Sequence, residues 1–391
     1  MRTNIILTIA LLCTSFAATA QSSARELELA SDAVAQAKAA TASDARQTVF
    51  GIKAYHDTDG RLVVGGVTSD SLARKAVIAR LAETGVHYAD SIKLMPYNRW
   101  ALTSLSAASH RTAPRHAAEM ATQSVMGTPL RVLETSGEWV RVQTPDGYIA
   151  YVPSSSIAIK TPEEMDAWRK GKRFIVASPY QLRAYTSPTA QGPREVVSDL
   201  VCGNIVTAVG GAVKIDNGRL HIELPDGRTG YADTSALMPL EQWAAQDFDA
   251  DLILDTAYSM EGTPYLWGGT SVKALDCSGL AKVSYYANGI ILLRDASQQA
   301  LTGTRIEAAN WRTCRPGDLL FFGNANTKKV THVAIYDHAG RYVHSSGRVK
   351  RNSVDPEASD YLTTPFLHAT RIAGNEETAG IVRARNHPWY F

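Results

Sequence analysis

The sequence predicts an α+β protein built from several small domains in a row. Its length of 391 residues corresponds to about two to four domains of ordinary size. A hydrophobic fraction of 45% with 20% charged residues is typical of a folded chain and excludes disorder as its main state. An internal repeat of short strands supplies the β part, and one well-marked helix late in the chain supplies the α part.

The first twenty residues predict an export signal. Arg2 gives the positive start, and the apolar run 5–13 is too short to span a bilayer. Ala18 and Ala20 form a small-residue cleavage site. We therefore expect export to a bacterial periplasm, with no stable membrane span after cleavage; the alternative is a segment that stays on as an anchor.

Charge and cysteine content narrow the functional class. The 40 basic and 38 acidic residues leave a net charge of +2, which lacks the footprint of a nucleic-acid-binding protein. Export leaves Cys202, Cys277 and Cys314, and an odd number keeps at least one thiol out of an intramolecular disulfide. We expect a monomer without a nucleic-acid partner.

Residues 21–97 predict a helical lead-in followed by a small α+β module. Residues 21–45 are rich in alanine and polar side chains. Two extended runs then meet at the turn 57–60, and apolar spacing predicts a helix over 71–83. Residues 86–95 return to extended character, which completes a strand–strand–helix–strand order.

A repeat predicts two tandem small β-barrels, over 98–160 and 161–243. The segment 144–152 recurs at 224–232, and both copies contain Pro-Asp-Gly before a short alternating strand. This tripeptide favours a tight turn, because proline presets φ, aspartate bonds its own backbone and glycine accepts positive φ. Short strands around such turns are typical of small barrels.

Residues 244–391 carry the candidate nucleophile. The strings 263–269 and 275–280 place Cys277 in the first turn of a buried helix. Free backbone N–H groups and the positive end of the helix dipole favour a thiolate there. We therefore expect Cys277 to be an activated nucleophile.

Two histidines predict the base for that nucleophile. His332 and His344 lie on two strands joined by the turn 337–340, and they face each other if the hairpin centres near His338. One imidazole can then take the proton of Cys277 while the other orients it. A metal site is set aside, since neither Cys-x-x-Cys nor His-Glu-x-x-His occurs, and no cofactor is expected.

Taken in order, these strings resemble a known family. They are Tyr265-Leu266-Trp267-Gly268-Gly269, Asp276-Cys277-Ser278-Gly279-Leu280, Pro316-Gly317-Asp318-Leu319, His332-Val333-Ala334-Ile335-Tyr336 and His344-Ser345-Ser346-Gly347. Together they strongly resemble the NlpC/P60 cysteine peptidases over residues 250–375. The two predicted barrels are similar to bacterial SH3 (SH3b) domains. The resemblance implies a papain-like α+β domain that follows two SH3-like barrels.

The resemblance also implies roles for individual residues. Cys277 is the nucleophile, His332 the base, and His344 the polar third member. Tyr265 helps to hold the oxyanion together with the Cys277 N–H. Further substrate contacts are implied for Asp276, Ser278, Ser297, Glu119 and Tyr148.

The pair Glu119 and Tyr148 is implied to recognise a free L-Ala amine. The chain departs from the family pattern in two places: Leu293 stands where relatives have proline, and Tyr151 where many have tryptophan. The first departure changes the loop before Ser297.

The chain also resembles one subgroup of this family, the γ-D-glutamyl-L-diamino acid endopeptidases of the dipeptidyl-peptidase VI type. The expected substrates are murein-derived peptides with a free N-terminal L-Ala, cut between D-Glu and the diamino acid. Two alternatives stay open. One is an endopeptidase, amidase or transpeptidase acting on polymeric peptidoglycan; the other is a wall-binding protein without catalysis.

Overall fold

The computed structural model describes the backbone of residues 2–189 and 195–391, and side chains from residue 21 onward. The predicted export signal, residues 1–20, therefore lies outside the residues whose side chains are described. The chain divides into two compact units, Met1–Tyr97 and Asn98–Phe391. Among the helices described, none is long and apolar enough to cross a membrane.

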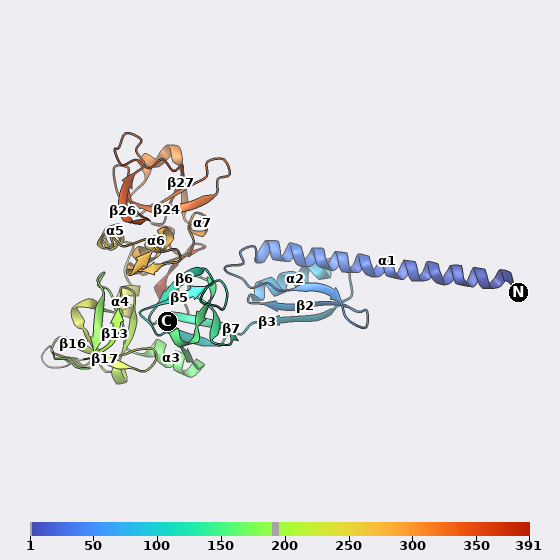
Figure 1. Cartoon of the computed structure of the whole chain (residues 1–391), viewed down its shortest axis with the longest axis horizontal. Helices are drawn as coiled ribbons and strands as arrows, with labels where there is room; N and C mark the ends of the chain where they lie inside the picture. The colour runs from blue at the N-terminus through green and yellow to red at the C-terminus, as the bar shows by residue number, and fades with distance from the viewer. Residues whose placement is uncertain (1, 190–194) are drawn as a thin grey trace. The chain divides into compact units, whose positions relative to one another are not determined.

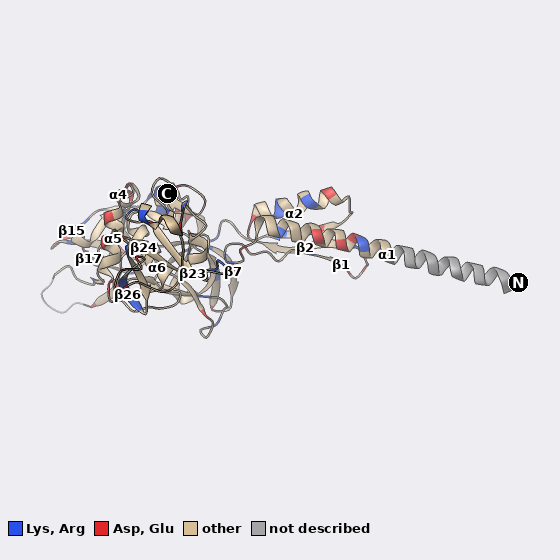
Figure 2. Cartoon of the chain, turned by 90° about the horizontal axis from the view of Figure 1, so that it is seen from above, with Lys and Arg blue, Asp and Glu red and all other residues tan. Residues whose placement is uncertain are grey.

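The first unit is a three-stranded sheet covered by two helices (Figure 1). Strand β2 pairs antiparallel with β1 and parallel with β3, and α2 forms the crossover between β2 and β3. The colours of Figure 2 mark basic and acidic residues along α2. The elements are α1 (Arg2–Thr41), β1 (Lys53–His56), β2 (Leu62–Thr68), α2 (Ser71–Thr84) and β3 (Ala89–Leu94).

The alanine-rich lead-in is part of this unit's core. Ala30, Ala33 and Ala37 of α1 are buried in one cluster with Val77 and Leu81 of α2. Small side chains on α1 allow its backbone to approach its neighbours closely. The segment predicted to be a helical lead-in forms a helix that ends at Thr41.

The second unit begins with a seven-stranded antiparallel sheet, here called the first β-domain. Its strand order is β10-β4-β7-β8-β9-β5-β6. Helix α3 follows, with Thr161 in a capping box at its start. The elements are β4 (Trp100–Thr103), β5 (Ala107–Arg111), β6 (Met120–Val125), β7 (Pro129–Ser136), β8 (Trp139–Gln143), β9 (Ile149–Pro153), β10 (Ile157–Lys160) and α3 (Pro162–Lys170).

A second antiparallel sheet, the second β-domain, repeats the same hairpin. Gly147 and Gly227 occupy matching turns with φ of 83° and 87°, the left-handed conformation that glycine adopts most easily. The strands are β11 (Arg173–Val176), β12 (Leu182–Tyr185), β13 (Val196–Leu200), β14 (Ile205–Ala208), β15 (Ile215–Asp216), β16 (Arg219–Glu223), β17 (Thr229–Asp233) and β18 (Leu237–Pro239).

The C-terminal domain packs helices on a six-stranded sheet of order β22-β27-β23-β24-β25-β26. One core lies between α5, α6 and the sheet, and a second covers the other face. The bounds are α5 (Ala250–Ser259), α6 (Cys277–Ala287), α7 (Ala296–Gln299), β22 (Thr304–Glu307), β23 (Leu319–Gly323), β24 (Val330–Tyr336), β25 (Arg341–Ser346), β26 (Arg348–Ser353) and β27 (Phe366–Arg371). The predicted α+β class is confirmed.

Candidate active site

Helix α6 begins at Cys277, and the preceding aspartate caps it. The Asp276 carboxylate accepts the Gly279 N–H at 2.7 Å and the Gly268 N–H at 2.9 Å. A side chain at Gly279 would lie 1.9 Å from the Gly269 carbonyl oxygen, so only glycine permits this approach of loop and helix. Cys277 keeps 9% of its surface exposed. The glycines around the cysteine thus hold the helix start in place.

His332 and His344 are diagonal neighbours, not opposite partners. The expected hairpin centre near His338 is wrong by one residue, because the ladder pairs Ile335 with Val343. A one-residue shift of the centre moves each partner by two positions, and residues two apart share a face of the sheet. Both imidazoles therefore stay on one face, and diagonal neighbours remain within reach of long side chains.

The two imidazoles form a hydrogen-bonded pair, and a third side chain extends it. His332 Nε2 lies 2.8 Å from His344 Nδ1, and His344 Nε2 lies 2.9 Å from Asn352 Oδ1. Asn352, on the neighbouring strand β26, donates its amide to the Asp360 carbonyl at 2.6 Å. His344 is fully buried, whereas His332 is half-buried. Nothing in the local sequence pattern indicated Asn352.

The thiol of Cys277 lies against the backbone N–H groups of Ser278 and of Val333, the residue that follows His332 on β24. Burial raises the pKa of Cys277 to about 11, and the Asp276 charge adds to it, although both N–H groups act in the opposite direction. Burial and the neighbouring His344 lower the pKa of His332 to about 3. The expectation of a resting thiolate is therefore wrong: desolvation outweighs the helix start, and the site rests as neutral thiol and neutral imidazole.

A buried arginine organises the residues that flank the cysteine. Arg294 donates to Asp276 Oδ2 at 2.6 Å, to Ser278 Oγ at 2.9 Å and to Thr122 Oγ1 of the first β-domain at 2.9 Å. Its side chain is only 1% exposed. Asp276 and Ser278, predicted to meet the substrate, are thus also members of an internal network. Nothing in the sequence pattern indicated this role for Arg294, which directly follows Leu293.

Tyr265 lies close enough to the cysteine for their charges to interact. Burial, followed by the charges of Cys277 and Asp276, raises the pKa of Tyr265 to about 12. The phenol therefore stays protonated and can donate a hydrogen bond. Its backbone N–H donates to the Gly347 carbonyl at 3.0 Å, which ties this loop to the start of β26.

The first β-domain brings Glu119 to the loop before the cysteine. The exposed Glu119 carboxylate accepts the Trp267 indole N–H at 2.7 Å. Tyr148 is 8% exposed and packs with Ala121 within the same β-domain. Ser297, by contrast, is exposed in the short helix α7.

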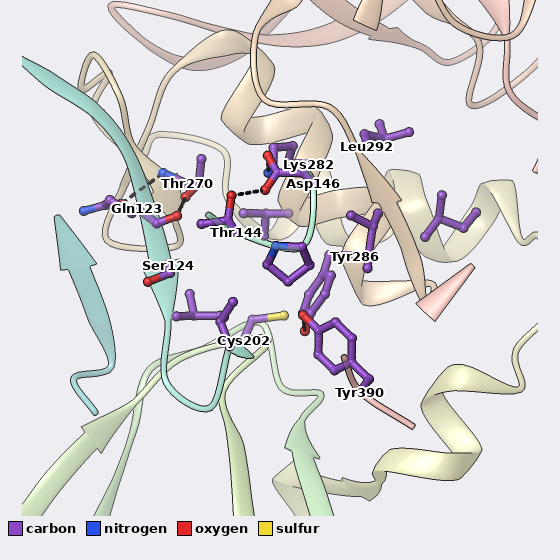
Figure 3. A pocket seen from close by; sticks show the side chains of 16 residues that line it. Gln123, Ser124, Thr144, Asp146, Cys202, Thr270, Lys282, Tyr286, Leu292 and Tyr390 are labelled. Carbon is purple, nitrogen blue, oxygen red and sulfur yellow. Dashed lines mark hydrogen bonds and ion pairs between the residues drawn. The ribbon is translucent and has the colours of Figure 1, made fainter. Parts of the chain in front are cut away.

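The opposite side of α6 carries a separate pocket at the junction of both β-domains and the C-terminal domain (Figure 3). Lys282 lies five residues after Cys277, so it points to the other side of the helix. Its ammonium pairs with Asp146, which also accepts the Thr144 hydroxyl at 2.5 Å. This pair fastens the first β-domain to α6 away from the candidate nucleophile.

All three cysteines outside the predicted signal are free thiols. Cys202 lines the pocket of Figure 3, and burial raises its pKa to about 12. Burial has the same effect on Cys314, whose pKa is also about 12.

The fold and this site define a class of protein. A cysteine opens a helix packed on an antiparallel sheet, and two hydrogen-bonded imidazoles lie on the adjoining strands. This is the arrangement of a papain-like cysteine hydrolase, in which one imidazole is the base and a further group orients it.

Comparisons with known proteins give the family. The NlpC/P60 family matches residues 262–371, and the bacterial dipeptidyl-peptidase Sh3 domain matches residues 110–157. The probable endopeptidase NlpC of Escherichia coli is 36% identical over 121 residues, which are 30% of this chain and 75% of that protein. The chain belongs to the NlpC/P60 family of cysteine peptidases.

Relatives with longer matches include the SH3-like region. Dipeptidyl-peptidase 6 of Lysinibacillus sphaericus is 27% identical over 61% of this chain and 86% of its own length. The γ-D-glutamyl-L-lysine dipeptidyl-peptidase of Bacillus cereus is 25% identical over 64% of this chain and 74% of its own length. A crystal structure of an NlpC/P60 family protein from Bacillus cereus superimposes with a TM-score of 0.60, at 20% identity, over 70% of this chain and 99% of that one.

Proposed function

We propose that this protein is an exported cysteine endopeptidase that cuts the bond between γ-D-Glu and the diamino acid in murein-derived peptides. Relatives that match most of their own length are named dipeptidyl-peptidase 6 and γ-D-glutamyl-L-lysine dipeptidyl-peptidase. The observation that carries the proposal is the hydrogen-bonded pair of His332 and His344, with the Cys277 thiol against the backbone of the next residue, Val333. An exposed carboxylate of the first β-domain, that of Glu119, lies on the loop before the cysteine.

The reaction begins with proton transfer inside a neutral pair. His332 takes the thiol proton as the sulfur of Cys277 attacks the γ-carbonyl carbon. The tetrahedral intermediate then collapses, and the imidazolium of His332 gives that proton to the leaving amine of the diamino acid. Water, deprotonated by the same imidazole, hydrolyses the thioester and returns the thiol. His344 stabilises each imidazolium by accepting the hydrogen bond from His332 Nε2.

The developing oxyanion needs donors that remain protonated. Tyr265 satisfies this condition, because its pKa is raised to about 12. The Cys277 N–H is the second donor, since the first residue of a helix has no acceptor within the helix. Donors of this kind contribute about 2.7–4 kcal/mol of transition-state stabilisation each.

Selectivity for a free N-terminus would come from the first β-domain. Glu119 offers a carboxylate on the side of the loop that leads to Cys277, and Trp267 holds one of its oxygens. A charge-assisted hydrogen bond to the ammonium of L-Ala would anchor the peptide two residues before the cut. We assign Tyr148, Asp276, Ser278 and Ser297 to the same binding region.

Export to the periplasm, and action there as a monomer, belong to the same proposal. Their support is the charged start, short apolar run and small-residue cleavage site of residues 1–20. Peptides released from the wall are the substrates that this compartment would supply.

The test is product analysis by mass spectrometry. The purified protein is incubated with L-Ala-γ-D-Glu-L-Lys, the diaminopimelate equivalent, their N-acetylated forms and intact sacculi. We expect L-Ala-D-Glu from the free peptides, at least tenfold less from the acetylated forms, and none with Cys277→Ala. Faster release from sacculi than from free peptides would overturn the assignment to free peptides, and no release from any substrate would overturn the activity.

A further inference from the structure

We propose that Asn352 is a positioning residue that decides which ring nitrogen of His344, and through it of His332, carries the proton. The inference builds on the proposed cysteine chemistry but makes no assumption about the substrate. It follows from three hydrogen bonds in series, each with only one possible direction.

The first bond fixes the amide of Asn352. Its nitrogen lies 2.6 Å from the Asp360 carbonyl oxygen, which can only accept. The amide therefore cannot turn over, and its oxygen must face His344. The Asp360 carboxylate is not used in this contact, since it pairs with Arg341 at 3.1 Å.

The second bond fixes the tautomer of His344. Asn352 Oδ1 lies 2.9 Å from His344 Nε2, and an amide oxygen accepts only, so His344 Nε2 carries a hydrogen. Burial lowers the pKa of His344 to about 4, so the ring is neutral near pH 7. A neutral ring has one N–H, which leaves Nδ1 as an acceptor.

The third bond fixes His332. His344 Nδ1 accepts from His332 Nε2 at 2.8 Å, so that nitrogen carries the hydrogen. The lone pair of neutral His332 then lies on Nδ1, the nitrogen left to receive the thiol proton of Cys277. With the opposite tautomer at His344, His332 would carry its hydrogen on Nδ1 and could not act as the base.

Few other groups contact the hydrogen-bonded row formed by His332, His344 and Asn352. Tyr342 on β25 packs edge-on against His344 at 5.1 Å, and Lys350 on β26 is its direct cross-strand partner. The Lys350 charge lowers the pKa of both histidines, whereas the Asp276 charge from the α6 side raises that of His332. Asp360 contacts Asn352, the last residue of this row, through its backbone carbonyl. Among the contacts described, no acidic side chain hydrogen-bonds either imidazole.

Two substitutions separate positioning from simple structural support. Asn352→Leu keeps the shape but removes the acceptor, so both tautomers of His344 become accessible. We expect kcat and the alkylation rate of Cys277 to fall about 10- to 100-fold, the range seen when outer-shell partners of a site are removed. KM on the free tripeptide should stay within about twofold, because Asn352 does not touch the peptide.

Asn352→Asp has a different signature. The new carboxylate raises the pKa of His344 by about 1–3 units, and the imidazolium then donates from both nitrogens. His332 Nε2 must accept, so its Nδ1 becomes protonated and the base is lost. Activity should therefore be absent below the raised pKa and return above it, which moves the acid limb of the pH profile upward.

The experiment measures iodoacetamide alkylation of Cys277 from pH 4 to 10, together with nitrogen-15 NMR of the histidine rings in the wild-type protein. Asn375→Leu is the matched control, because it removes an amide bonded to Arg371 and Thr304 outside the hydrogen-bonded row. We expect His344 protonated on Nε2 and His332 on Nε2. His344 protonated on Nδ1, or an unchanged alkylation profile in both folded Asn352 variants, would overturn the proposal. Neither readout needs a peptide, so a wrong substrate assignment would leave the result intact.

Discussion

The two β-domains share one hairpin but use its turn in different ways. In the first, Asp146 of the Pro-Asp-Gly turn is 5% exposed and pairs with Lys282 of helix α6. In the second, Asp226 at the matching position is 31% exposed and pairs with Arg228, two residues along its own chain. The same local sequence thus makes a domain contact in one copy and an ordinary surface turn in the other.

The two β-domains also differ at a second pair of matching strands. These are β6, which follows Glu119 in the first β-domain, and β13, which follows Glu195 in the second. Thr122 on β6 accepts from Arg294, the residue that supports the cap of the catalytic helix. Ser198, at the matching place on β13, donates to the Asp199 carbonyl next to it. The first β-domain is therefore part of the candidate active site, and the second supports the molecule from outside it.

The largest expected difference concerns stability. Lys282→Met leaves the Asp146 carboxylate buried without its cation, and we expect a loss of about 3 kcal/mol in the free energy of unfolding, the lower end for buried pairs. Arg228→Met, the matched change in the second β-domain, should cost about 0–1 kcal/mol, as exposed pairs do. Urea denaturation measures both. Equal losses would show that the two turns are equivalent.

The next difference concerns the hydrogen bond to Arg294. Thr122→Val leaves the guanidinium Nε without an acceptor, which costs about 1–3 kcal/mol for a buried donor. Ser198→Ala, on the matching strand, should change stability by less than about 0.5 kcal/mol. Thermal unfolding at fixed pH compares them, and a larger effect at Ser198 would contradict the distinction.

A third comparison concerns the substrate amine. Glu119→Gln removes the charge that would pair with the ammonium of L-Ala, so we expect KM for free tripeptide to rise about 10- to 100-fold with kcat nearly unchanged. Glu195→Gln changes the matching exposed glutamate of the second β-domain and should leave both constants as they are. Initial rates decide the question. If both variants behave like the wild type, Glu119 does not bind the amine.

The smallest expected effect concerns Lys350. Its charge lowers the pKa of both histidines, so Lys350→Met should raise both pKa values. The base must be neutral to act. The pH below which activity falls should therefore rise in this variant, by less than about one pH unit. The pH dependence of kcat/KM measures this shift. A shift of the acid limb to lower pH would contradict the sign of the effect.

Local patterns in the sequence predicted much of the fold. The Pro-Asp-Gly turns, the helix that starts at Cys277 and the strands around residues 337–340 all depend on near neighbours in the chain. The error of one residue in the hairpin centre arose because turn signals at 337–340 do not specify which residues take positive φ, and Ala339 and Gly340 do so here.

The partners that lie far apart in the chain could not be predicted. Arg294 and Thr122 are separated by 172 positions, and Lys282 and Asp146 by 136. No periodicity connects such residues, because only the packing of one domain on another brings them together. The prediction of a charged, resting thiolate at Cys277 was wrong for a related reason. The helix start can be recognised in the sequence, but the degree of burial cannot.

The central claim is that a neutral thiol at position 277 is activated by His332. The rate of iodoacetamide alkylation of Cys277, followed from pH 4 to 10 in the wild type and in His332→Ala, tests it directly. With pKa values of about 3 for His332 and about 11 for Cys277, the pair holds one proton throughout this range. We therefore predict a wild-type rate that is nearly constant from about pH 5 upward and falls only where His344, with its pKa of about 4, becomes protonated. In the variant we predict a slow rate that rises toward high pH. Identical profiles in the two proteins would contradict the account.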